Sequence, residues 1–159
     1  MTTEAQSGSS PDRQELSLND ATSHVLEECR TVVPGMQALF GFQLIAVFST
    51  AFREELSSTE RIVHLAAILL VTVAIVLVMA PAALHRQMEP MSVSRKFITI
   101  SSRLLMASMA PFAAGICLDI YIVARVTLGT TVGAVIIAVL SLVVFVVFWL
   151  VVPRLSRRR

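Results

Sequence analysis

Asp119 is the residue whose type and position are best suited to chemistry in this chain. It is the only acidic residue within four long apolar stretches, which cover residues 32–52, 62–84, 104–124 and 128–152. An acid at the centre of a membrane helix costs about 2.5–3.5 kcal/mol, so it marks a proton or ion site or a polar contact with another helix. The helical rise puts Asp119 about 7 Å from the middle of its stretch, toward Arg125.

Three further polar residues in the apolar stretches are candidates for the same two roles: His64, Gln43 and Gln37. Gln37 and Gln43 are six residues apart, so they do not share a helix face. We expect Asp119 to point into a helix bundle, where Gln43, Thr50, Arg61 or His64 can meet it. Buried amides tie membrane helices together. We therefore interpret these residues first as helix-tying groups and second as a proton or ion site.

Patterns typical of catalysis or metal binding are missing from the sequence. The three histidines fall at different depths, and the two cysteines, Cys29 and Cys117, fall too far apart in depth to pair. There is no Ser-His-Asp order, no glycine-rich phosphate loop and no pair of carboxylates. We expect no catalytic residues, no metal and no cofactor, and a protein that is not an enzyme.

The composition indicates a membrane protein. Apolar residues make up 55% of the chain and charged residues 15%, whereas a soluble domain has about 25% charged residues. Each apolar stretch has roughly the 20 residues that a membrane helix needs, and none alternates with the period of a strand. We predict an all-α polytopic membrane protein, a bundle of four transmembrane helices. A soluble enzyme, a disordered protein and a nucleic-acid-binding module do not fit this composition.

The distribution of Lys and Arg predicts the orientation. On a four-span count, ten of the 13 lie on one side of the membrane, and Arg53, Arg61 and Arg125 lie on the other. The side richer in Lys and Arg faces the cytoplasm, so we expect both termini there. The ten are Arg13, Arg30, Arg86, Arg95, Lys96, Arg103, Arg154, Arg157, Arg158 and Arg159.

The segments around the spans have their own patterns. We expect a disordered cytoplasmic tail over residues 1–16 and the membrane domain over residues 17–153. The basic residues 154–159 are expected to form a cytoplasmic tail that contacts anionic lipids rather than nucleic acid. Residues 18–33 and 92–103 predict two interfacial amphipathic helices. We expect Pro34-Gly35 to bend or interrupt the chain before the first span, and the second span to bend or end near Pro81.

Small residues predict where helices approach closely. Ala107, Pro111 and Gly115 form a stripe that leads to Asp119, and Gly129 and Gly133 form a GxxxG pair. The GxxxG pair has two open interpretations, packing within the chain and formation of a homo-oligomer.

Two segments resemble a known family. Residues 33–43 (VPGMQALFGFQ) and 79–86 (MAPAALHR) are similar to a family of small bacterial four-span membrane proteins of unknown function, some of which carry an automatic sodium:proton antiporter label. The resemblance covers about residues 20–127. It implies a bacterial cytoplasmic membrane and points to Glu28, Arg30, Pro34, Gln37, Gln43, His85 and Arg86, without assigning them a role.

Two functions from different classes remain. The first is a non-enzymatic membrane protein with a structural or accessory role. The second is a small transporter that couples to protons or sodium ions through Asp119. A water-accessible cavity at Asp119 favours the second, whereas a dry bundle with Asp119 paired favours the first.

Overall fold

The computed structural model describes residues 18–88 and 95–156, and these residues form helices joined by short turns. Three long helices dominate: α1 (Leu18–Ala46), α3 (Ser58–Met88) and α4 (Arg95–Leu128). Beside them stands a composite helix, in which α5 (Thr131–Val146) continues through a π-helical segment η1 (Val147–Val151) into α6 (Val152–Ser156). The short α2 (Thr50–Glu54) lies in the connection from α1 to α3. The predicted tail 1–16 and the last basic residues, 157–159, lie outside the described part.

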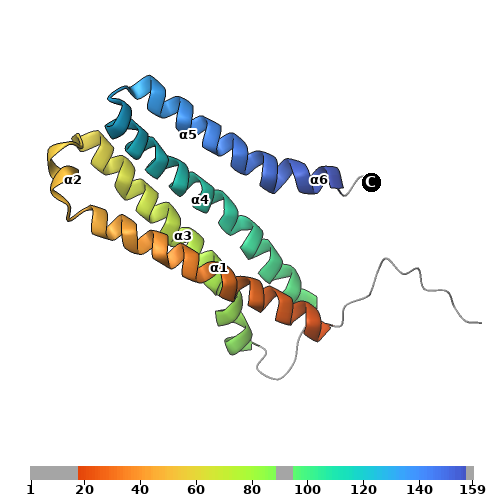
Figure 1. Cartoon of the computed structure of the whole chain (residues 1–159). Helices are drawn as coiled ribbons and strands as arrows, with labels where there is room; N and C mark the ends of the chain where they lie inside the picture. Colours follow the sequence, from red (N-terminus) through yellow and green to blue (C-terminus); the bar gives the residue numbers. More distant parts are fainter. Residues whose placement is uncertain (1–17, 89–94, 157–159) are drawn as a thin grey trace, which may run out of the picture.

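The helices run alongside one another in an antiparallel order (Figure 1). Helix α4 lies between α3 and α5 and makes the most extensive contacts with both, while α1 packs on α3 and more lightly on α4. The connection through α2 and the α4–α5 turn lie at one end of the described part, and the start of α1, the end of α3 and α6 lie toward the other (Figure 1). The packed core is therefore the three-helix group α1, α3 and α4.

Three helices in the described residues are long and apolar enough to cross a membrane: Ser58–Gln87, Lys96–Leu128 and Thr131–Ser156. They support a membrane protein, but the predicted count of four spans is not confirmed. The first predicted span, residues 32–52, is not a single helix, because α1 ends at Ala46 and a turn separates it from α2. Two glutamines and a proline also make this segment less apolar than the other three.

The predicted break at Pro34-Gly35 does not exist in the structure. The segment 18–33 was expected to be a separate interfacial helix, but α1 continues through Pro34 without interruption. The described part of the other predicted interfacial segment, residues 95–103, is continuous with the third predicted span, since α4 is one helix from Arg95 to Leu128. Helix α3 likewise does not end at Pro81 but runs to Met88, with its last turns leaning away from the first part of the axis (Figure 1).

Helix α5 presents an almost wholly apolar surface. Within its residues only Ala134 is buried, and large side chains such as Val132, Ile136 and Leu140 are more than half exposed. A water-exposed surface of this kind is unfavourable in a soluble protein, whereas acyl chains solvate it readily. The exposure therefore agrees with a helix in contact with lipid.

The two glycines of the predicted GxxxG pair do not share a helix. Gly129 lies in the turn after α4 with a φ of 65°, and Gly133 lies in the first turn of α5. A Cβ atom on Gly133 would come within 2.9 Å of Leu128 Cδ1 and of Thr130 Oγ1. Both glycines thus serve the α4–α5 turn of their own chain.

We expect Gly129→Ala to destabilise the protein by about 1–2 kcal/mol, because a residue with a Cβ atom is strained at positive φ. Gly129→Asn should lose less, since asparagine tolerates this conformation. Gly35→Ala is the matched control, because a Cβ atom there meets nothing within 4 Å. Unfolding by SDS in mixed micelles measures all three; an equal midpoint for Gly129→Ala and Gly35→Ala would contradict the expectation.

Candidate functional site

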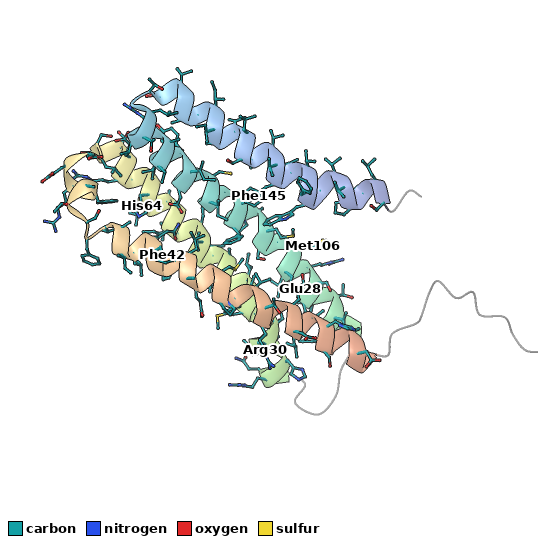
Figure 2. The ribbon with its side chains drawn as sticks, viewed as in Figure 1. Glu28, Arg30, Phe42, His64, Met106 and Phe145 are labelled. Carbon is teal, nitrogen blue, oxygen red and sulfur yellow. The ribbon has the colours of Figure 1, made fainter. Side chains whose placement is uncertain are left out.

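Three polar side chains from three helices meet near the end of the bundle that carries α2. Gln43 of α1 donates through Nε2 to Asp119 Oδ2 of α4 at 2.6 Å. His64 of α3 places Nδ1 3.4 Å from Asp119 Oδ1 and Nε2 3.0 Å from the backbone oxygen of Gln43. We call these three residues the polar cluster; Figure 2 shows His64 in its place on α3 beside α1.

The contacts confirm the expectation that Asp119 points into the bundle. Gln43 is 4% exposed and His64 7% exposed, and the Asp119 side chain is 20% exposed. The helix pair that carries His64 and Asp119 is drawn together one turn away, where Gly115 of α4 lies against Ala67 and Val71 of α3. A small residue at this contact lets the two backbones approach, as in other membrane helix pairs.

The hydrogen-bond geometry places one hydrogen of the polar cluster. A carbonyl oxygen only accepts, so His64 Nε2 carries a hydrogen and donates it to the backbone oxygen of Gln43. The other ring nitrogen, Nδ1, faces Asp119 Oδ1. A proton on either of these two atoms would make their contact attractive and leave the pair without net charge, which lowers the cost of burying it.

Two acceptor atoms of the polar cluster lack a hydrogen-bond donor. Both Gln43 Oε1 and Asp119 Oδ1 are buried without a hydrogen bond among the described residues. The distance from Oδ1 to His64, 3.4 Å, is longer than a good hydrogen bond. The cluster is thus joined by two firm hydrogen bonds and one longer contact.

Cavities on two sides reach Asp119. One, of about 380 Å³, is lined by the whole polar cluster and mainly by apolar side chains from α1, α2 and α4, including Phe52, Leu56 and Ile122. The ring of Phe52 meets the His64 ring edge-on, with centroids 5.3 Å apart. The other, of about 450 Å³, lies between α4 and α5 and is almost entirely apolar.

Charged residues at the same end of the bundle are engaged elsewhere. Arg125 Nε lies 3.4 Å from Glu60 Oε1, which links the end of α4 to the start of α3. Arg61, a predicted partner of Asp119, instead donates to the backbone oxygens of Arg53 and Leu56. Thr50 and Gln37, the other predicted participants, are exposed, and no hydrogen bond links them to the polar cluster.

The sequence analysis missed the role of Glu60, although the signal for it is local. Ser57 and Glu60 form a capping box: the Ser57 amide donates to Glu60 Oε2 at 2.7 Å, and the Glu60 amide donates to Ser57 Oγ at 3.3 Å. A serine followed three residues later by glutamate predicts this helix start. The box caps the start of α3, and its Glu60 lies four residues, about one helical turn, before His64, so it helps to position the cluster.

Five of the seven residues singled out by the family resemblance line two cavities at the opposite end of the bundle, whereas Gln43 belongs to the polar cluster and Gln37 lines neither cavity. A cavity of about 610 Å³ between α1 and α3 is lined by Arg30, Pro34, His85 and Arg86. Glu28 lines a different one, of about 340 Å³, which also reaches Trp149. Figure 2 shows the labels of Glu28 and Arg30 on opposite sides of α1. We call the larger cavity the basic cavity.

The thiol of Cys29 also lines the basic cavity. Burial, and then the neighbouring Glu28 carboxylate, raise the pKa of Cys29, so it remains protonated at neutral pH. Cys29 and Cys117 are both free and buried. Among the described residues, no group of three or more His, Cys, Asp or Glu side chains is arranged to hold a metal ion.

Comparison with known proteins places the chain in a family. The model of a family of unknown function, DUF6328, matches residues 13–153, and the chain therefore belongs to this family. No curated protein and no solved structure matches the chain.

Proposed function

We propose that this protein is a multi-pass integral membrane protein of a bacterial cytoplasmic membrane that acts in a structural or accessory role, without enzymatic activity. In this proposal α1 completes the membrane domain as a fourth span. Both termini face the cytoplasm. Described basic residues support this orientation: Arg30, Arg86, Lys96, Arg103 and Arg154 lie toward one end of the helices, and Arg53, Arg61 and Arg125 toward the other.

The observation that supports the structural role is that Asp119, the one acidic residue in the predicted spans, contacts polar groups of two other helices. Asp119 is bonded to Gln43 and faces His64, so each of the three helices α1, α3 and α4 contributes one polar group to a shared contact. Such contacts contribute about 0.6–2 kcal/mol each in a membrane. A carboxyl group held in this way serves to join helices rather than to bind a transported solute.

Reconstitution into proteoliposomes with an imposed pH gradient tests the role. We expect the native protein to dissipate the gradient no faster than empty liposomes, with or without sodium ions. A reporter fused after Arg159 should be active only in the cytoplasm. Protein-dependent proton flux that Asp119→Asn abolishes would contradict the structural role, and a reporter active only outside would contradict the orientation.

A proton-coupled transporter is the second candidate, favoured by one specific observation. The cavity of about 380 Å³ at the polar cluster reaches the His64–Asp119 pair, and both side chains of that pair can bind a proton. A solute in this cavity would lie beside a group whose charge depends on the proton. Flux that requires both His64 and Asp119 would support this function over the structural one.

A further inference from the structure

The basic cavity combines charged and apolar side chains in a pattern that suits an amphiphile. It lies between the N-terminal half of α1 and the C-terminal half of α3 and has a volume of about 610 Å³. We propose that the basic cavity binds one anionic phospholipid, with the phosphate between Arg30 and Arg86 and the start of an acyl chain along α3. This site rests on the proposed membrane location but not on the proposed orientation.

The charges of the cavity select an anion. Arg30 and Arg86 come from different helices and line the same space, and arginine is always charged and matches the geometry of phosphate oxygens. Among the described residues that line the cavity there is no Asp or Glu. Glu28, which neighbours Cys29, lines a different cavity.

His85 supplies a second, independent polar group. It lines the cavity next to Arg86, and its Nδ1 is buried without a hydrogen bond among the described residues. The ring itself is held in place, since it packs on Phe97 of α4 with centroids 5.5 Å apart. His85 therefore adds a fixed, polar aromatic ring to the basic side of the cavity, next to Arg86.

The depth of the apolar residues distinguishes a lipid from a free anion. Val78 and Met79 line the same cavity eight and seven residues before Arg86, which places them about 11–12 Å from it along the axis of α3. Ala82 lies between the two levels, and Val33 faces them from α1. A free phosphate would use the basic rim alone, whereas a phospholipid also covers the apolar wall.

Native mass spectrometry of the full chain in detergent tests the site. The protein is titrated with a phosphatidylglycerol and with a phosphatidylcholine of the same acyl chains. We expect phosphatidylglycerol to bind at least about tenfold more tightly and Arg30→Gln/Arg86→Gln to remove this preference. The matched control is Lys96→Gln/Arg103→Gln, which removes two exposed charges from α4 outside the cavity and should keep the preference.

A second variant tests the apolar wall without changing the charge. Ala82→Trp fills the cavity and should weaken phosphatidylglycerol binding about tenfold, with the helical circular dichroism of the native protein retained. If Arg30→Gln/Arg86→Gln and Lys96→Gln/Arg103→Gln lost the preference for phosphatidylglycerol equally, the preference would come from the overall charge of the protein, and the proposed site would be overturned. Displacement of the lipid by millimolar inorganic phosphate as readily as by a short-chain phosphatidylglycerol would show a free-anion site instead. Because these measurements are made in detergent, a reversed topology reporter would overturn the orientation and leave the lipid result standing.

Discussion

Replacing Asp119 by leucine is expected to destabilise the protein by about 2–4 kcal/mol, because each buried polar group left without a partner costs about 1–3 kcal/mol. The substitution removes the acceptor of the Gln43 amide and the group that faces His64 Nδ1. Three helices lose a shared contact at once. The midpoint of SDS unfolding in mixed micelles measures the loss.

Asparagine at position 119 separates the packing role from the charge. Its side-chain oxygen can accept from Gln43 and its amide can donate to His64 Nδ1, so Asp119→Asn should lose only about 1 kcal/mol. Ser141→Leu is the control for a polar-to-leucine change, since the Ser141 hydroxyl bonds only to Ile137 of its own helix. Equal losses for Asp119→Leu and Ser141→Leu would contradict the helix-tying role.

Gly115→Leu is expected to destabilise the protein by about 3 kcal/mol or more, since overpacking a core contact typically costs 1–3 kcal/mol and leucine adds four carbon atoms here. A Cβ atom alone would come within 2.8 Å of Val71 Cγ2 and 3.2 Å of the Ala67 backbone oxygen. Val71 is fully buried and branched at Cβ, so it cannot turn aside. Helices α3 and α4 must separate, and the polar cluster one turn away must loosen with them.

Smaller changes at the same contact provide the controls. Gly115→Ala should cost about 1–3 kcal/mol, and adding Val71→Ala should recover part of this loss in a double-mutant cycle. Gly41→Ala should be neutral or stabilising by up to about 1 kcal/mol, because a Cβ atom there meets nothing within 4 Å. All of these variants are measured by SDS unfolding. Additive losses for Gly115→Ala and Val71→Ala would contradict a direct clash between the added Cβ atom and Val71.

Helix content and the place of Asp119 could be predicted from local features. An apolar run of about 20 residues has few other stable forms in a membrane. The second and third predicted spans lie within α3 and α4, and the fourth, residues 128–152, coincides with the α5–α6 segment from Thr131 onward. The cost of an acid in lipid predicted that Asp119 would face other helices. The positions of Gln43 and His64 in the predicted spans limited its possible partners.

The first predicted span shows where local patterns are insufficient. The absence of charge from residues 32–52 predicted one helix there, and Pro34-Gly35 predicted an earlier break. The structure reverses the two: the helix passes through Pro34 and stops at Ala46. Proline costs helix stability mainly through a lost hydrogen bond and a clash one turn before it, and packing of α1 on α3 offsets that cost. The stop at Ala46 begins the turn that carries α2 against His64.

The sequence alone determined that the chain is helical, with apolar segments and a buried acid. This was possible because each polar side chain has its own free-energy cost in lipid, whatever the tertiary structure. Which polar groups meet depended on the tertiary structure. Gln43 reaches Asp119 and Gln37 does not, because the rotation of α1 about its axis turns the face that carries Gln43 toward α3 and α4. Arg30 and Arg86, 56 residues apart in the numbering of the chain, line one cavity for the same reason. Helix rotation and close approach depend on the shapes of many side chains at once, and no single spacing in the sequence encodes them.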